Sequence, residues 1–201
     1  MRAAASAPVQ TRLQTGLLTH LHPGKVYRRE DLTLWSRSLD RDLQQLTGNG
    51  LLKKLAQGLY YAPTQSTFGA LPPDDQEVVG AFLRDANFLI FSPNAYNSLG
   101  VGTTQLYNTT WVYNHKRHGK FRLGNRFYQF RNKPRFPRAL TQEFLLVDLI
   151  NNLDMLAEDK NLLLERVRRR FAEMDQKQLD ENLTNYASVA TKKRTHDWLR
   201  V

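Results

Sequence analysis

Residues Val26–Pro63, VYRREDLTLWSRSLDRDLQQLTGNGLLKKLAQGLYYAP, carry the strongest structural signal in this chain. A short helical pattern occupies residues 29–34, and a second one follows and reaches about residue 47. Ser36 and Ser38 are candidate N-caps of the second helix, because a serine side chain can accept a hydrogen bond from a free backbone N–H of the first turn. The apolar residues of this helix recur at the spacing of one helical face and are Leu39, Leu43 and Leu46.

Two short strands are predicted after this helix. Asn49-Gly50 can close the helix, since both residues tolerate positive φ. Residues 51–55 and 59–62 form the strands, Ala56-Gln57-Gly58 forms the turn between them, and Pro63 ends the second strand. Helix, turn, helix and hairpin in this order are typical of a winged helix-turn-helix, which places one helix in the DNA major groove.

The composition favours a polyanionic partner. The chain has 201 residues, with 29 Lys and Arg against 19 Asp and Glu, and a formal net charge of +10. Such an excess favours nucleic acid first and an anionic membrane surface second, with solubility alone as the plain alternative. The absence of Cys excludes disulfides and thiolate zinc sites and is compatible with a reducing cytoplasm. We expect no membrane-spanning helix and no signal peptide.

The whole pattern predicts a mixed α/β chain of two domains. A helix over 11–21 and a linker over 64–74, rich in Thr, Gly, Pro and Asp, flank the winged helix-turn-helix. We therefore expect a winged helix-turn-helix domain at 10–63 and an α/β domain with C-terminal helices at 75–201. The elements expected in the second domain are helices over 77–84, 92–100, 141–153, 159–171 and 176–190, and strands over 87–91, 109–114, 121–123 and 126–131.

The outward face of the helix that ends near residue 47 provides candidate base contacts. With the leucines inward, arginine and glutamine face outward, and these side chains suit guanine and adenine edges respectively. Serines near the helix start suit a phosphate. The outward set is Ser36, Arg37, Ser38, Arg41, Gln44 and Gln45. Because Asp40 and Asp42 partly neutralise this face, a solvated helix of a protein-binding winged helix is the alternative interpretation.

The hairpin and the start of the preceding helix add candidate contacts with the DNA backbone. Lys53 and Lys54 lie on the first strand, where Lys54 should alternate outward and reach a phosphate. Gln57 at the turn could enter a minor groove, although ordinary turn chemistry explains it equally well. Arg28 and Arg29 open a helix, where positive charge opposes the macrodipole and indicates a partner such as the DNA backbone.

Basic residues also cluster in the predicted second domain. One group follows a strand and others lie on the C-terminal helices, where they could extend the footprint on DNA or simply face solvent. The candidate phosphate contacts are Lys116, Arg117, Lys120, Arg168, Arg169, Lys192 and Lys193. A further basic group at 131–138 interleaves with aromatic residues. Such a pattern occurs in single-strand binding and, more often, in a sheet with aromatics inside and basic residues outside.

Catalytic interpretations have little support. The histidine pairs at 20–22 and 115–118 lack a carboxylate at ligand spacing, so we expect no metal site and no cofactor. Asp74 and Glu158 faintly match a nuclease pattern, but Glu158 precedes a predicted helix rather than lying on a strand. No GxxxxGK[ST] phosphate loop occurs in the sequence. We therefore expect a protein that is not an enzyme, with a metal-dependent nuclease as the weaker alternative.

Several segments resemble a known family. LDRDLQQLTGNGLLKKLAQGLYYAP at 39–63 is similar to AbiEi-type antitoxins and their DUF6088-like relatives, in which a leucine-spaced helix leads to a glycine, a basic strand and a terminal G-x-Y. FLIFSPNAYNSLGVGTTQ at 88–105 resembles the strand, small-residue helix and Leu-Gly turn of that family. TTWVYN, RFYQFR and ALTQEFLLVDLINNL follow in the expected order. The resemblance covers residues 13–153 and is weaker in the C-terminal helices.

This resemblance implies an autorepressing antitoxin of a type IV toxin–antitoxin pair. The implied partner is the double-stranded DNA of its own promoter, and a nucleotidyltransferase-like toxin would be encoded beside it. In type IV systems the antitoxin need not contact its toxin. The implied location is the cytoplasm. A protein-interaction module that neutralises a toxin by direct contact is the main alternative.

Overall fold

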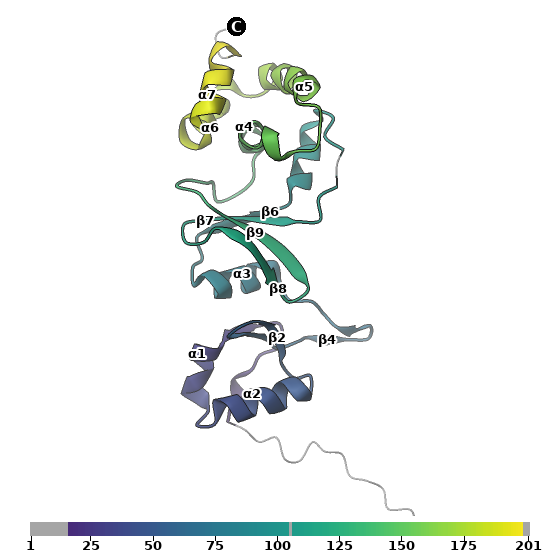
Figure 1. Ribbon diagram of the computed structural model, residues 1–201, viewed down its shortest axis with the longest axis vertical. Helices are drawn as coiled ribbons and strands as arrows, with labels where there is room; N and C mark the ends of the chain where they lie inside the picture. Colours follow the sequence, from purple (N-terminus) through teal and green to yellow (C-terminus); the bar gives the residue numbers. More distant parts are fainter. Residues whose placement is uncertain (1–15, 105, 199–201) are drawn as a thin grey trace, which may run out of the picture. The chain divides into compact units, whose positions relative to one another are not determined.

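The computed structural model describes residues 16–104 and 106–198 and shows a mixed α/β protein, as predicted. The chain divides into two compact units (Figure 1). Unit 1 comprises the residues up to Asp85 together with Arg122–Arg126, and unit 2 comprises Ala86–Phe121 and Phe127–Val201. Residues 11–15 of the helix predicted over 11–21 lie outside the described residues, and its described part contains the 3-10 turn η2 (Leu18–His20).

Unit 1 contains short helices and a three-stranded sheet. After η2 the elements are β1 (Val26–Arg28), α1 (Arg29–Leu32), η3 (Thr33–Trp35), α2 (Leu39–Gly48), β2 (Lys53–Ala56) and β3 (Leu59–Tyr61). The sheet order is β1-β3-β2, and both pairings are antiparallel. Helix, turn, helix and hairpin thus follow one another in the predicted order.

The strand β1 is absent from the sequence prediction. Its three residues are all half-buried and show no alternation of apolar and polar side chains. They become a strand because they pair with β3, with Val26 opposite Tyr61 and Arg28 opposite Leu59. A strand this short is therefore specified by its partner rather than by its own pattern.

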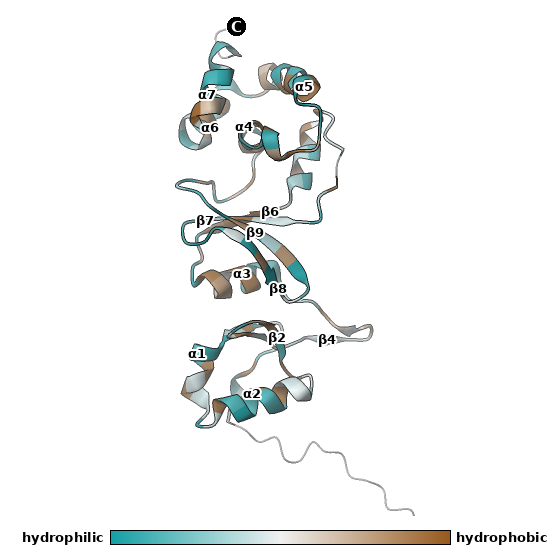
Figure 2. Ribbon diagram, in the orientation of Figure 1, coloured by the Kyte–Doolittle hydropathy of each residue, from teal (hydrophilic) through white to brown (hydrophobic). Residues whose placement is uncertain are grey.

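The leucine row of α2 forms the centre of unit 1. Leu39, Leu43 and Leu46 are buried, which confirms the predicted inner face, and they share a core with Leu32 and Tyr60. Burial of each leucine side chain stabilises the fold by about 1.5–3 kcal/mol. The opposite side of α2 is hydrophilic (Figure 2). The fold therefore anchors this helix by one face and leaves the other face free.

The boundary between the two units lies later than the sequence predicts. The segment predicted as a linker over 64–74 contains the small hairpin of β4 (Gln65–Ser66) and β5 (Gly69–Ala70). The helix α3 (Asp75–Leu83), predicted in the second domain, belongs to unit 1, which extends to residue 85.

Two polar contacts explain why α3 belongs to unit 1. Lys25 pairs with Glu77 at 2.5 Å between Nζ and Oε1. Arg28 donates a hydrogen bond of 2.9 Å to the carbonyl oxygen of Ala81, in the last turn of α3, where carbonyls lack helical partners. Contacts between residues so distant in sequence cannot be read from local composition.

Unit 2 contains a four-stranded sheet, except for Arg122, Leu123 and Arg126, which belong to unit 1, and all four strands were predicted. They are β6 (Phe88–Phe91), β7 (Thr110–Asn114), β8 (Gly119–Leu123) and β9 (Arg126–Asn132), in the order β6-β7-β9-β8. β6 and β7 are antiparallel, whereas β7 and β9 are parallel. Leu89, Phe91, Trp111 and Tyr113 of this sheet belong to the apolar core of unit 2.

The helices of unit 2 gather around one buried helix, α4 (Gln142–Asn151). It lies between the sheet and helices α5 (Lys160–Glu173), α6 (Gln176–Tyr186) and α7 (Val189–Thr195), as Figure 1 shows. All residues from Phe144 to Ile150 are buried, as expected for a helix covered on every side. Shorter 3-10 helices are η4 (Pro93–Leu99), η5 (Leu153–Met155) and η6 (His196–Trp198).

One helix predicted over 176–190 is in fact two helices. Ala187 is extended and separates α6 from α7. The side chain of Ser188 then accepts a hydrogen bond of 3.1 Å from the backbone N–H of Thr191, which caps α7. The serine that interrupts the predicted helix is thus the N-cap of the next one. Ser92 is likewise the N-cap of η4, as predicted.

A hydrogen-bonded polar cluster lies inside unit 2. We call it the Asp148 cluster, and its members are Tyr96, Tyr113, Arg131, Asp148 and Asn152, all buried. Tyr96 Oη donates to Asp148 Oδ2 at 2.7 Å, and Tyr113 Oη donates to the same carboxylate at 2.9 Å. Arg131 donates to Asn152 Oδ1 at 2.5 Å, and its guanidinium carbon lies 3.6 Å from the ring centroid of Trp111.

The position of Arg131 corrects a sequence interpretation. Residues 131–138 were interpreted as a basic group on the outer surface, but Arg131 is only 6% exposed and Lys133 is half-buried. The reason is that Arg131 finds a buried amide and an aromatic face, which compensate the loss of water around its charge.

Candidate nucleic-acid interface

The outward face of α2 presents polar side chains without internal partners. We call Arg37, Ser38, Arg41, Gln44 and Gln45 the reading face, and all five are exposed. Their side chains have no hydrogen-bond or ion-pair partner within residues 16–104 and 106–198. Arg41 and Gln45 are one helical turn apart, and Arg37 lies just before the helix. These long side chains project from a helix that the buried leucines hold in place.

The acidic residues of α2 have partners within unit 1. Arg29 holds Asp40 by three hydrogen bonds of 2.8–3.2 Å from its guanidinium. Ser36 donates a hydrogen bond of 2.6 Å to Asp42 Oδ2 and accepts one of 3.0 Å from the backbone N–H of Ser38. The sequence interpretation treated both carboxylates as neutralising the outward face. Arg29 offsets the charge of Asp40, whose side chain is 82% exposed, whereas Asp42 keeps its charge beside the Ser36 hydroxyl.

Three residues predicted to contact DNA have structural contacts. Arg28 donates to a carbonyl at the end of α3, and Arg29 pairs with Asp40, whose hydrogen bond and charge raise the pKa of Arg29. Ser36 is half-buried and organises the start of α2. The sequence correctly indicated that Arg28 and Arg29 have partners, but the partners in the structure are protein groups.

The hairpin of β2 and β3 presents the other predicted residues of unit 1. Lys53, Lys54 and Gln57 are exposed, and no described residue pairs with their side chains. Both lysines lie on β2, an edge strand of the sheet, and the pairing of β2 with β3 shifts register only after them, between Lys54 and Ala56. Gly58 has φ +69°, a conformation that favours glycine, so the turn is specified locally.

The basic residues predicted in the second domain are all exposed in unit 2. They are Lys116, Arg117, Lys120, Arg168, Arg169, Lys192 and Lys193. Lys120 Nζ lies 4.8 Å from the ring centroid of Phe127, and Lys192 Nζ donates to the Thr184 carbonyl oxygen at 3.0 Å. None of these seven residues belongs to the same compact unit as the reading face.

The described residues contain neither a candidate metal site nor a candidate membrane span. Within residues 16–104 and 106–198, no three His, Cys, Asp or Glu side chains are grouped so that they could hold a metal ion. No helix in that part of the chain is both long enough and apolar enough to cross a membrane.

Comparisons with known proteins give a likeness of fold. No protein-family model matches the chain, and no curated protein matches it. Among solved structures, the chain is similar to the crystal structure of the Rv2827c protein from Mycobacterium tuberculosis, with a TM-score of 0.55 and 18% sequence identity. The match covers 88% of this chain and 71% of that chain. The TM-score indicates that the two proteins share a fold, and the low sequence identity supports no conclusion beyond the fold.

Proposed function

We propose that this protein is a DNA-binding transcriptional regulator that represses its own promoter and is not an enzyme. Unit 1 acts as a winged helix-turn-helix, with α2 in the major groove of double-stranded DNA. The reading face contacts base edges, and Lys53 and Lys54 contact phosphates.

The observation that carries this proposal is the contrast between the two faces of α2. One face buries three leucines, and the other presents Arg41, Gln44 and Gln45, with Arg37 just before the helix, and none of these side chains has a partner among the described residues. Arginine and glutamine are the side chains that make bidentate contacts with guanine and adenine, each contributing about 1–3 kcal/mol of discrimination. The ion pair of Asp40 with Arg29 offsets the charge of one of the two carboxylates of α2, which lowers the repulsion of DNA phosphates.

The charge of the chain supports the same partner. A formal net charge of +10 attracts nucleic acid and accelerates association with it. The exposed cations of unit 2 would then provide additional phosphate contacts that do not depend on sequence.

The biological role rests on the resemblance to AbiEi-type antitoxins. We propose that the protein is the antitoxin of a type IV pair in the cytoplasm, linked to a nucleotidyltransferase-like toxin without obligatory contact. Direct neutralisation of the toxin by contact is the alternative. Copurification with the product of the neighbouring gene distinguishes the two, since only the alternative requires a stable complex.

A base-substitution scan tests the DNA-binding proposal. The binding site in the promoter would first be located by footprinting, and each base pair would then be replaced in turn. Arg41→Ala should abolish discrimination at one base step and leave the other steps unchanged. Arg138→Ala is the control, because Arg138 is an exposed arginine of unit 2 outside the reading face. Equal losses for Arg41→Ala on cognate and random DNA would refute its role as a base reader.

A further inference from the structure

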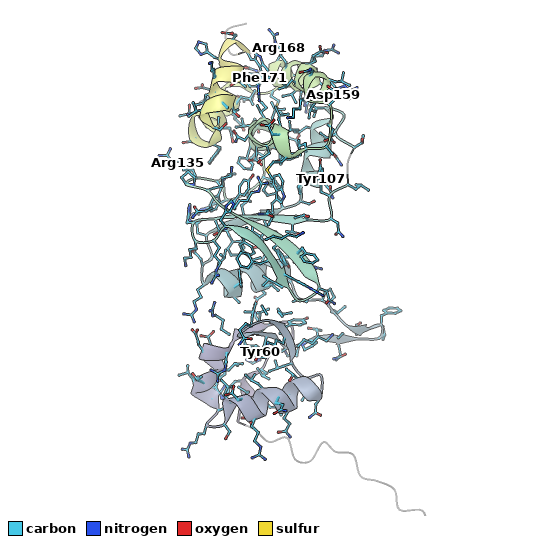
Figure 3. The ribbon with its side chains drawn as sticks, in the orientation of Figure 1. Tyr60, Tyr107, Arg135, Asp159, Arg168 and Phe171 are labelled. Atoms are coloured by element: carbon cyan, nitrogen blue, oxygen red, sulfur yellow. The ribbon has the colours of Figure 1, made fainter. Side chains whose placement is uncertain are left out.

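A cleft in unit 2 combines charged and aromatic side chains. It has a volume of about 390 Å³ and is lined by Glu165, Arg168, Arg169, Phe171, Ala172 and Trp198. We call it the α5 cleft, since five of these residues lie on α5 and the sixth on η6. Arg168 and Phe171 are neighbours on α5 in Figure 3. Ligand sites in proteins commonly have volumes of about 300–1,000 Å³ and a mainly apolar lining with a few polar groups.

The apolar part of the α5 cleft is aromatic. Phe171 is only 1% exposed, and its ring centroid lies 5.5 Å from that of Trp198 at an interplanar angle of 80°. The indole of Trp198 remains partly exposed. A partly exposed indole held against a buried ring offers a fixed surface on which a planar group can stack.

The polar part of the α5 cleft combines two cations and one carboxylate. Arg168, Arg169 and Glu165 are exposed, and no residue in the described part of the chain forms a hydrogen bond or ion pair with their side chains. Two guanidinium groups at one cleft suit a phosphate, which arginine can bind in a bidentate manner. The single carboxylate is an acceptor and suits an amino group.

We propose that the α5 cleft binds a purine nucleotide group. The base stacks on Trp198, the phosphate is held by Arg168 and Arg169, and Glu165 accepts a hydrogen bond from the exocyclic amine. A free nucleotide and a nucleotide within a single strand offer the same base and phosphate, so the cleft recognises the group that the two sources share. This site lies in unit 2 and does not depend on the reading face of α2.

Calorimetric titration of the full chain with AMP tests this proposal, with adenosine and ribose 5-phosphate as partial probes. AMP should bind with a submillimolar Kd and at least about tenfold more tightly than either partial probe, since each lacks one half of the recognised group. Arg168→Ala and Arg169→Ala should each weaken AMP binding about tenfold, whereas the exposed control Arg138→Ala should not change it. Trp198→Phe keeps an aromatic ring beside Phe171 and should remove the quenching of tryptophan fluorescence by AMP.

A second titration distinguishes the two sources of the nucleotide. A single-stranded oligodeoxyadenylate that binds more tightly than AMP, and loses affinity in Arg168→Ala, would assign the cleft to single strands. An oligonucleotide no tighter than AMP would assign it to free nucleotides. Absence of AMP binding at about 1 mM would overturn the proposal, as would equal affinity for ribose 5-phosphate or unchanged binding by Arg168→Ala and Arg169→Ala. None of these failures would affect promoter binding by α2.

Discussion

The reading face of α2 and the Asp148 cluster use similar side chains in opposite ways. Both contain arginine and amide groups, but every member of the reading face is exposed and without a described partner. Every member of the Asp148 cluster is buried and hydrogen-bonded. Buried polar groups must find partners inside the protein, because losing water without a replacement is costly. Exposed polar groups have no such requirement, so they remain available to a ligand.

The comparison predicts that the Asp148 cluster serves stability and that the reading face serves binding. Substitutions in the cluster should therefore lower the free energy of unfolding. Substitutions in the reading face should change affinity for DNA and leave the free energy of unfolding unchanged.

Asp148→Ala should have the largest effect. It removes the acceptor of two buried tyrosine hydroxyls, each of which would lose its hydrogen bond at a cost of about 1–3 kcal/mol, so we expect a loss of about 2–6 kcal/mol in the free energy of unfolding. Urea unfolding measures this loss. Asp148→Asn should cost less, because its amide oxygen can still accept from Tyr96 or Tyr113. A loss below about 1 kcal/mol for Asp148→Ala would mean that the cluster does not hold unit 2 together.

Arg41→Ala should have the next largest effect, on binding rather than on stability. We expect a loss of about 1–3 kcal/mol on cognate DNA and a much smaller loss on scrambled duplex, because a bidentate contact with one base is removed. Fluorescence anisotropy measures both affinities. The urea midpoint should not change, since Arg41 is exposed and has no partner in the described chain. A lowered midpoint would show that the reading face also supports the fold.

The pH dependence of the free energy of unfolding tests the contribution of Asp148 to the Asp148 cluster. Burial raises the pKa of Asp148 above its ordinary value of 3.8, against the opposing effect of the Tyr96 and Tyr113 hydroxyls. The folded protein thus holds this proton more tightly than the unfolded chain. The resulting stability is fully present below pH 3.8 and is lost as the pH rises through the raised pKa of the folded state.

This contribution to the slope is at most about 1.4 kcal/mol per pH unit for a single group. Urea midpoints across a pH series should show it in the wild type, and Asp148→Asn should flatten it. Asp180→Asn, at an exposed position of α6, is the control and should retain the slope. Identical slopes in Asp148→Asn and wild type would rule out Asp148 as the source.

Lys54→Ala should have the smallest effect and should act on all DNA sequences alike. A lost phosphate contact weakens cognate and random DNA equally and reduces the dependence of log affinity on log salt by about one. Binding isotherms at several salt concentrations measure the slope. A loss of affinity that is restricted to cognate DNA would show that Lys54 contacts a base rather than a phosphate.

The sequence predicts elements well where the pattern is local and repeated. The leucine row at 39, 43 and 46 identified α2 and its buried face, and all four strands of unit 2 were located. The three-residue strand β1 was missed, since it is a strand only by pairing with β3. The helix predicted over 176–190 was wrong in one respect, because Ser188 begins a new helix there.

Contacts between distant residues explain the remaining differences. Asp148 and Tyr96 are separated by 52 positions, and Arg28 and Ala81 by 53. No local pattern connects such residues, so neither the buried cluster nor the place of α3 in unit 1 could be predicted. The pairing of Arg29 with Asp40 spans only 11 positions, but it depends on how α1 packs against α2 and so was not predicted.

The most direct test of the central claim is binding of the wild-type protein to its own upstream promoter DNA and to a scrambled duplex across a salt series. We predict tight binding to the promoter and weaker binding to the scrambled duplex. The difference between the two affinities should persist at high salt, because contacts with bases do not depend on the release of counterions. Equal affinity for the two duplexes at every salt concentration would contradict the claim, since charge alone would then explain the binding.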